Sequence, residues 1–363
     1  MKNTFGSNIT VTLFGESHGE MIGAVIDGLT PGIVIDDDYI REKLALRRPS
    51  GTISTARREP DDYRIVSGAF GGFTTGTPLT VLIENTNTKS SDYESLRYTP
   101  RPGHADYTAE CKYNGYQDRR GGGHFSGRVT AALVAAGAII SSALEASGVM
   151  IGTHISSLGG ICDRPFACTE SDIAILSKKN FPVIDGNAAE KMRKAIEAAA
   201  AEGDSVGGIL ETAVIGLPAG LGEPWFDTVE GVLSHALFSV PGIKGIEFGA
   251  GFGFANMRGS EANDPFRFED GRVVTATNNN GGINGGITNG MPVIFRCAVK
   301  PTPSIFKRQD TVDLKSGENT TLELRGRHDP AIIHRARAVV DAVTAIAIAD
   351  LLASRYGSGC LGD

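Results

Sequence analysis

The chain has 363 residues, of which 41% are hydrophobic and 21% are charged. This composition is typical of a folded globular protein with a substantial core, and it excludes disordered and fibrous chains. The net charge of −7 argues against a nucleic-acid binder, which would carry a basic excess.

The five cysteines are odd in number, scattered along the chain and free of C-x-x-C pairs. This pattern indicates reduced thiols, with neither a disulfide framework nor a zinc site. The N-terminal residues show no signal-peptide pattern, and no apolar run is expected to reach the roughly 18 residues of a membrane span. We therefore expect a cytoplasmic protein that needs no membrane and no metal.

The N-terminal third predicts short strands and one helix. The expected strands cover residues 9–14, 22–26, 63–66 and 79–84. The first two are joined by the polar turn GESHG, residues 15–19. A helix is expected over residues 36–48, because Pro49 then ends it.

Polar chemistry is concentrated in residues 101–128, directly before a long apolar segment. The three glycines at 121–123 allow positive φ and a close approach of the main chain to a ligand. A helix is predicted from Ser126 or Gly127 to just before Gly148, with Ser126 as a possible N-cap. A helix N-terminus beside arginines favours an anion. The alternative, a glycine-rich turn that only caps a buried helix, stays open on spacing alone.

The C-terminal part alternates strands and helices. Strands are expected at residues 149–157, 208–215 and 291–299, and helices at 190–201, 226–238 and 332–354. Residues 242–290 are rich in glycine and asparagine, and their interleaved apolar residues indicate tight turns and not disorder. Because no composition shift marks a linker, we expect one α+β domain over residues 1–363.

Two motifs suggest enzyme classes that their context disfavours. GESHG matches the G-x-S-x-G nucleophile elbow with Ser17 as nucleophile, but an elbow needs a following helix where a strand is predicted. His18 in the same motif suits acid–base chemistry, or is simply a hydrogen-bonded turn histidine. GAGFGF, residues 249–254, departs from the dinucleotide fingerprint because its third glycine comes one residue early. Serine hydrolase and non-catalytic anion binder are carried as competing classes.

GRHDP, residues 326–330, precedes the last predicted helix. Asp329 and Pro330 suit the N-cap and the first helical position. Beside Arg327, the carboxylate of Asp329 could also handle a proton, and sequence logic does not separate the two roles.

The motifs taken together resemble one family, the chorismate synthases. In chain order they are GESHG, LRRPSG with RREPDD, SGAFGGFTTGTPL, SSDY, RPGHADY, GGG-x-x-S-x-R-x-TA, EGDSVGG, PAGLGEPWFD, KGIEFGAGF, NNNGGINGG, KPTPSI and GRHDP. This resemblance covers nearly the whole chain. It implies an α+β fold, a β-α-β sandwich with helices between antiparallel sheets.

The resemblance also implies a reaction. It is the anti 1,4-elimination of phosphate from 5-enolpyruvylshikimate 3-phosphate to give chorismate, and it requires reduced FMN (FMNH2) without net redox change. The substrate carries two carboxylates and a phosphate, which suits the arginine clusters of this chain. By family analogy the protein is a homotetramer. Whether NADPH reduces the flavin on the enzyme stays open, and we expect an external reductant because no long insertion is evident.

Residue roles follow from the same resemblance. His18 would protonate the departing phosphate, His104 would act near the flavin, and Asp329 would assist proton removal at the flavin N5. Arg48 and Arg119 are expected to bind substrate anions. The expected flavin contacts are His124, Phe125, Ser126, Pro241, Gly242, Gly285, Lys300, Pro301, Thr302, Pro303, Ser304 and Arg327.

Two departures from the family pattern are visible. The commoner segment reads GGG-Arg-Ser-Ser-Ala-Arg, whereas His124 and Phe125 stand here after the glycines. One arginine and one hydroxyl are therefore missing, and main-chain N–H groups would have to supply flavin-phosphate contacts. The loop SGTISTA, residues 50–56, also lacks an arginine that is often found there.

Overall fold

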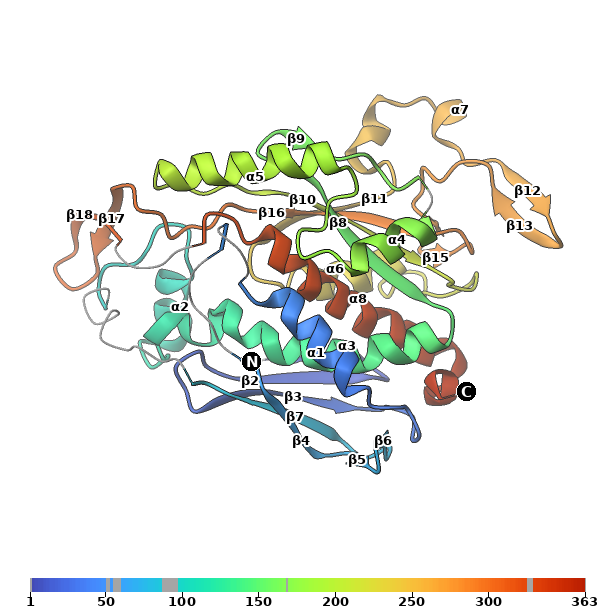
Figure 1. The fold of residues 1–363 in the computed structure, drawn as a ribbon, viewed down its shortest axis with the longest axis horizontal. Coiled ribbons are helices and arrows are strands. Elements are labelled where there is room, and N and C mark those ends of the chain that lie inside the picture. Colours follow the sequence, from blue (N-terminus) through green and yellow to red (C-terminus); the bar gives the residue numbers. More distant parts are fainter. Residues whose placement is uncertain are drawn as a thin grey trace.

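Two antiparallel sheets of five strands each form the outer layers of the molecule (Figure 1). The computed structural model describes residues 2–49, 53–54, 60–86, 97–167, 169–324 and 329–362. The first sheet contains, in order, β1 (Thr4–Phe5), β2 (Thr10–Gly15), β3 (Met21–Asp27), β7 (Leu79–Glu84) and β4 (Tyr63–Ser67). The second contains β11 (Ile243–Phe248), β16 (Val293–Val299), β10 (Gly208–Ile215), β8 (Met150–Leu158) and β9 (Ile161–Cys162).

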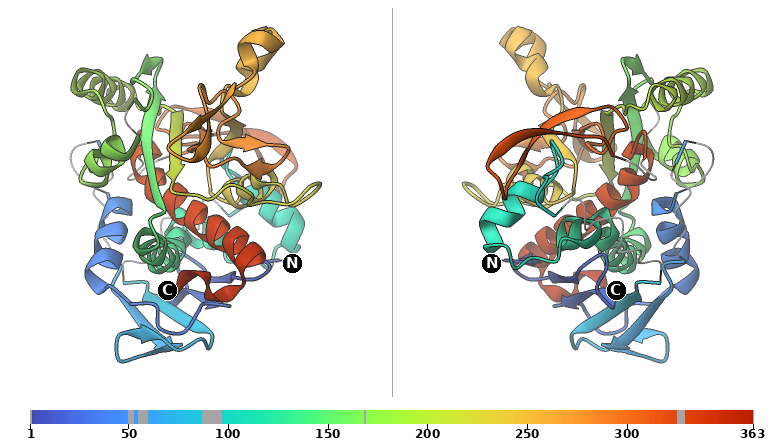
Figure 2. Two further views of the ribbon diagram at one scale, coloured as in Figure 1. Left: turned by 90° about the vertical axis from the view of Figure 1, so that its right-hand side faces the viewer. Right: turned by 90° about the vertical axis from the view of Figure 1, so that its left-hand side faces the viewer.

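Three helices fill the space between the sheets: α1 (Asp37–Arg47), α3 (Thr130–Ala146) and α8 (Ile333–Tyr356) (Figures 1 and 2). A fourth, α6 (Val229–Leu237), also packs against α8. Because helices in this layer are covered on most sides, α3 is almost entirely apolar, and α8 buries apolar residues together with a few paired charges such as Arg337 and Asp350. The expected sandwich of helices between antiparallel sheets is confirmed.

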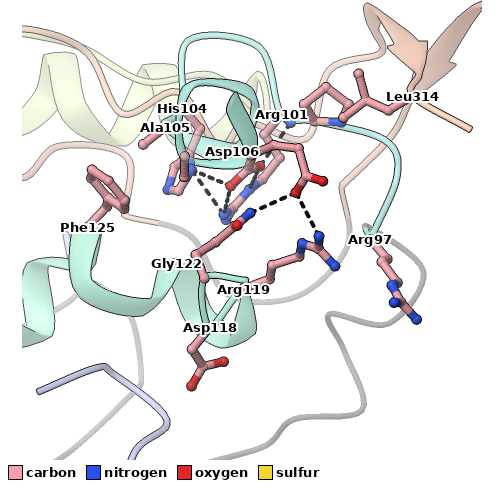
Figure 3. A pocket seen from close by; sticks show the side chains of 14 residues that line it. Arg97, Arg101, His104, Ala105, Asp106, Asp118, Arg119, Gly122, Phe125 and Leu314 are labelled. Atoms are coloured by element: carbon pink, nitrogen blue, oxygen red, sulfur yellow. Dashed lines mark hydrogen bonds and ion pairs between the residues drawn. The ribbon is translucent and has the colours of Figure 1, made fainter. Parts of the chain in front are cut away.

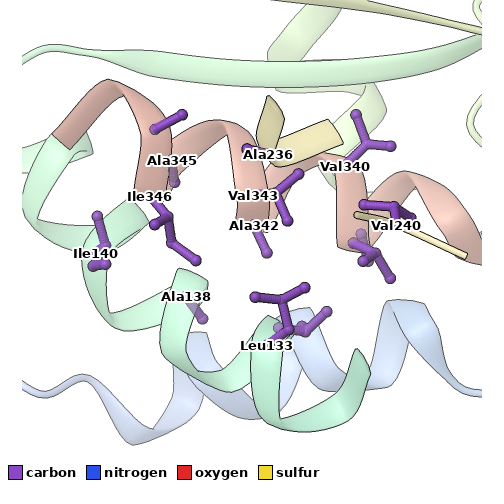
Figure 4. Packing of buried hydrophobic residues seen from close by; sticks show 14 of the residues in the cluster. Leu133, Ala138, Ile140, Ala236, Val240, Val340, Ala342, Val343, Ala345 and Ile346 are labelled. Carbon is purple, nitrogen blue, oxygen red and sulfur yellow. The ribbon is translucent and has the colours of Figure 1, made fainter. Parts of the chain in front are cut away.

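Small residues let α3 and α8 approach closely. A Cβ atom on Gly137 of α3 would lie 2.5 Å from the Cβ of Ala342 on α8, so only glycine fits at this contact. Leu133, Ala138 and Ile140 of α3 face the α8 residues around Ala342 and Ile346 (Figure 4). Close packing of this kind maximises dispersion contacts and removes apolar surface from water.

Two further helices, α4 (Thr169–Ser177) and α5 (Gly186–Ala201), cover the outer face of the second sheet. On β8, Thr153 donates to Asp341 of α8 at 2.6 Å, whereas a Cβ on the adjacent Gly152 would meet Ile173 of α4. Since successive strand residues point to opposite faces, α4 and α8 lie on opposite sides of the sheet.

Short elements complete the fold. α2 (Asp106–Tyr113) precedes the three glycines, and a short helix, α7 (Gly259–Ala262), leads into the hairpin of β12 (Phe266–Glu269) and β13 (Arg272–Thr275). This arm projects from the body of the molecule (Figures 1 and 2). The other hairpins are β5 (Ala69–Phe70) with β6 (Phe73–Thr74), β14 (Ile283–Asn284) with β15 (Ile287–Thr288), and β17 (Gln309–Asp313) with β18 (Glu318–Leu322).

The expectation that no apolar run reaches the length of a membrane span was wrong. The helical segment Gly127–Ala146 is long and apolar enough to cross a membrane by composition. Most of it is buried inside the protein, between the sheets. Its apolar length therefore reflects a place in the core layer.

The N-cap assigned to Asp329 is wrong. Helix α8 begins at Ile333, and its N-cap is Ile332. The carbonyl of Pro330 accepts a hydrogen bond from Val206 N at 2.9 Å, so the residues before α8 are tied to the loop ahead of β10. By contrast, the side chain of Ser126 does accept from Arg128 N and caps the 3₁₀ turn that leads into α3.

Candidate functional site

The GESHG turn joins two antiparallel strands, β2 and β3. Ser17 is fully buried, and its hydroxyl donates to the carbonyl of Gly121 at 3.2 Å. This arrangement contradicts a nucleophile elbow, which requires an exposed serine between a strand and a helix. The hydroxyl of Ser17 also lies 2.8 Å from Nδ1 of His18, and the two atoms share a hydrogen bond. The Nε2 atom of His18 is then the ring nitrogen that can exchange a proton with a ligand.

The three glycines bring the two predicted catalytic histidines together. Gly121, Gly122 and Gly123 have φ of +62°, +87° and +54°, as the sequence predicted. A Cβ on Gly121 would lie 2.1 Å from Cε1 of His18, and a Cβ on Gly122 would lie 3.4 Å from Cε1 of His104. The two imidazoles therefore lie against adjacent residues of one main-chain segment.

His104 is oriented by a carboxylate. Its Nδ1 lies 2.6 Å from Oδ1 of Asp106, the first residue of α2. Arg101 holds the same carboxylate through two side-chain bonds, of 2.7 and 2.8 Å (Figure 3). Burial alone would raise the pKa of Asp106, but the hydrogen bonds from Arg101 and His104 outweigh it and hold that pKa well below its usual range. Asp106 therefore stays ionised and receives the Nδ1 proton, which leaves Nε2 of His104 as the atom that can face a ligand.

A pocket opens between α2, the glycine segment and Leu314 near the β17–β18 hairpin (Figure 3). Its charged lining residues are Arg97, Arg101, Asp106, Glu110, Asp118 and Arg119. Arg119 donates to Glu110 at 2.7 Å and to the carbonyl of Gly115 at 3.1 Å. Within the described residues, its buried Nε has no hydrogen-bond partner. The predicted substrate arginine thus lines the pocket in a fixed position.

Residues 300–304 lie beside His104. Lys300 Nζ donates to the carbonyl of Gly103, and Lys300 N donates to the carbonyl of Gly242 at 2.9 Å. Burial, and then the charge of Lys244, lower the pKa of Lys300. The carbonyl of Thr302 accepts from Ser205 at 2.7 Å. This segment therefore joins Gly242 to the loop that carries His104.

The departure from the family pattern has a structural consequence. His124 Nδ1 donates to the carbonyl of Gly15 at 2.8 Å and so ties the glycine segment to the end of β2. Phe125 is 37% exposed, lines the pocket and meets Tyr113 edge-on. His124 is thus engaged with the main chain, and Phe125 offers an aromatic surface to a ligand.

Asp329 and Arg48 lie near the end of α1. Asp329 pairs with Arg335 at 2.7 Å, and Arg335 Nε donates to the carbonyl of Arg47 at 2.9 Å. Arg48 is half-buried and C-caps α1. Arg327 lies outside the described residues, as do parts of RREPDD and GRHDP and all of SSDY.

Of the predicted site residues, His104, Arg119 and Phe125 line this pocket, whereas Gly285 lies far from it. It lies in the turn between β14 and β15 with φ of +61°, and its neighbour Gly286 packs against Thr228 at the start of α6. In Figure 1, β15 and α2 lie at opposite ends of the molecule.

The chain matches known proteins along almost its full length. A model of the chorismate synthase family matches residues 9–353. The chain belongs to the chorismate synthase family. The chorismate synthase of Thermococcus gammatolerans is 49% identical, over 96% of this chain and 97% of its own. The chorismate synthase of Methanosarcina barkeri is 46% identical, over 96% and 95% respectively.

A solved structure has the same fold. A crystal structure of chorismate synthase superposes with a TM-score of 0.77 at 28% identity, covering 97% of this chain and 94% of that one. The family resemblance that the motifs predicted is confirmed. Chorismate synthases are lyases that act on a small molecule, and the family works with a reduced flavin.

Sequence reasoning missed several residues of this site. Arg101 and Asp106 lie in the quoted RPGHADY motif but received no role. The i, i+2 spacing of His104 and Asp106 was the available signal, because it lets a carboxylate reach an imidazole across a helix start. Asp61 and Asn85, which both bind the side chain of Arg128 just after the glycine segment, gave no such signal, because Arg128 is distant from both in the sequence.

Proposed function

We propose that the pocket beside Gly121 and Gly122 is where this chain converts 5-enolpyruvylshikimate 3-phosphate to chorismate with release of phosphate. The observation that supports this best is the placement of His18 and His104 against adjacent glycines. Two acid–base groups then act on one small ligand from neighbouring positions. The family match supports the same reaction.

The residues of the chain supply binding and proton transfer. Arg119 and Arg48 bind the anionic groups of the substrate, since guanidinium forks suit carboxylate and phosphate. His18 donates a proton from Nε2 to the departing phosphate, while its Nδ1 stays bonded to Ser17. His104 keeps a fixed tautomer because Asp106 receives its Nδ1 proton. Asp329, held by Arg335, is the proposed partner in proton removal.

The proposed cofactor is reduced FMN, and the residues present fit it. Gly122 lines the pocket without a side chain and so allows a flat ring to approach the main chain there. The ammonium group of Lys300, which bonds to the carbonyl of Gly103 next to His104, adds a positive charge that suits an anionic group of the cofactor. A buried hydroxyl, Thr302 Oγ1, has no partner within the described residues. Phe125 adds an aromatic face. When bound, the reduced flavin supplies electron density for C–O cleavage and ends unchanged.

The proposed flavin contacts are His124, Phe125, Ser126, Pro241, Gly242, Gly285, Lys300 to Ser304 and Arg327. Gly285 would fit this set if a second copy supplied it, which agrees with the homotetramer that we propose from the family. We further propose one domain, a cytoplasmic location, and an external flavin reductant; NADPH is the first to test.

The deciding measurement is anaerobic phosphate release from 5-enolpyruvylshikimate 3-phosphate with reduced FMN, with oxidised FMN and without flavin. We expect phosphate release only in the sample that contains reduced FMN, together with an equal rise in the absorbance of chorismate. Substrate binding without release under any of these conditions would overturn the proposed function.

His18→Ala and His104→Ala test the roles of the histidines. Each should lower turnover by about 100-fold or more, because a positioned acid or base contributes about that much. His235→Ala, on α6 against Phe5, is the matched control. Wild-type rates in both variants would refute these assignments, and circular dichroism confirms that each variant is folded.

A further inference from the structure

The turn that carries His18 is held by one amide side chain. Asn85 follows β7 directly, and its Nδ2 donates to the carbonyls of Glu16 and Gly19, each at 2.9 Å. These two carbonyls flank Ser17 and His18. The Asn85 N–H also donates to the carbonyl of Glu20 at 3.1 Å.

The orientation of this amide is fixed from its other side. Arg128 Nε donates to Asn85 Oδ1 at 2.9 Å. A guanidinium has donors only, so the amide oxygen must face Arg128 and the NH₂ group must face the turn. The opposite orientation would set a donor against a donor and an oxygen against two carbonyls.

Arg128 is itself immobilised by a buried ion network. It is 6% exposed, donates to the carbonyl of Glu84 at 3.0 Å and pairs with Asp61. Asp61 is 3% exposed and also binds Arg47 at 2.9 Å. Arg47 donates in turn to the carbonyl of Gly127 at 3.3 Å. The network therefore spans the end of α1, the end of β7 and the start of α3.

We propose that Asn85, fixed by Arg128 and Asp61, is a positioning residue that sets the place of His18 through the main chain of the GESHG turn. The role of His18 in turnover rests on the proposed function. Asn85, Arg128 and Asp61 together connect the start of α3 to the GESHG turn. The glycine segment and His18 therefore keep one relative position. None of the hydrogen bonds of Asn85 described above goes to the imidazole of His18. Asn85 therefore acts on His18 through the main chain of the turn.

Asn85→Asp tests this with almost no change in shape. The carboxylate keeps its bond to Arg128 but turns an oxygen toward the two turn carbonyls, which it then repels. We expect turnover to fall about 10-fold to 100-fold, since a displacement of about 1 Å at a reacting group costs this much. Asn187→Asp, the same change at an exposed position in the first turn of α5, should leave turnover unchanged.

Two readouts separate positioning from general damage. In a His18→Ala background, Asn85→Asp should have little further effect on turnover, because residues that act as a unit are not additive. Hydrogen exchange followed by mass spectrometry should be faster over residues 15–22 in Asn85→Asp and unchanged over α5. The exchange experiment needs neither substrate nor flavin.

Either of two results would overturn the proposal: unchanged exchange over residues 15–22, or a full additive loss of turnover in the double variant. If the wild type releases no phosphate, the proposed function fails. The exchange experiment would still decide whether Asn85 holds the turn.

Discussion

Asp106 shows how one carboxylate can serve both geometry and stability. Its side chain is 23% exposed and is bound by Arg101 and His104. Its lowered pKa means that the folded state favours the ionised form. This contribution to stability is present above the unfolded pKa, near 4, and is lost as the pH falls toward the folded value.

Asp106→Asn should therefore lower the free energy of unfolding by about 1–3 kcal/mol at pH 7. The difference from wild type should shrink as the pH is lowered below about 4. Turnover should also fall, because Arg101 no longer fixes the group that orients His104. Urea titrations at pH 7, 5, 4 and 3 measure the first effect. Asp270→Asn, at the exposed tip of the β12–β13 hairpin, is the control. A pH-independent difference would refute the electrostatic explanation.

At the scale of elements, the contact between α3 and α8 depends on one glycine. Gly137→Leu would place atoms where Ala342 already lies. The helices must then separate, and we expect a loss of at least about 1–3 kcal/mol in the free energy of unfolding, the usual cost of overpacking a core. Gly186→Ala in α5 is the control, because a Cβ there has no neighbour within 4 Å. Equal stability of Gly137→Leu and wild type would show that the two helices can slide apart freely.

Most helices and strands could be predicted from the sequence, because apolar periodicity and turn residues lie within each element or directly beside it. The alternation of apolar residues and the flanking turns located β2, β3, β7 and β10 within about a residue or two. α2 and α4 were missed because both are short and only weakly amphipathic. The start of α8 was placed too early, since Asp329 and Pro330 are held by Arg335 and Val206, contacts that no local pattern reveals.

The site was predictable only in part for the same reason. Positive φ at the three glycines followed from residue type. That His18 and His104 lie against adjacent glycines could be seen only in the complete fold. The roles of the two histidines were predicted from the family resemblance and not from their positions. Neither the residue pattern nor the family resemblance predicted that Gly285 lies at the opposite end of the molecule from α2.

At the scale of the molecule, the two ends of the chain are joined through Asp350. This α8 carboxylate accepts from the main-chain N–H groups of Ser7, Asn8 and Ile9 at 2.7–3.1 Å. The bonds fix the start of β2 to the last helix. The edge of the first sheet is therefore tied to the central layer.

Asp350→Ala should cost about 2–4 kcal/mol of unfolding free energy, because it leaves three N–H groups without their charged acceptor. Asp350→Asn, which keeps one acceptor oxygen, should cost less. Urea unfolding measures both, and limited proteolysis should cut the N-terminal residues of Asp350→Ala sooner. If both variants match the wild type, water replaces the carboxylate at no cost and the link is dispensable.

The backbone between the two histidines also limits how this enzyme can vary. His18 fills the space that a side chain at Gly121 would need, and His104 lies in van der Waals contact with Gly122, so this main-chain segment touches both imidazoles. An alanine at Gly121 would displace His18 at once. Laboratory evolution of this protein should therefore leave these glycines untouched while neighbouring positions drift.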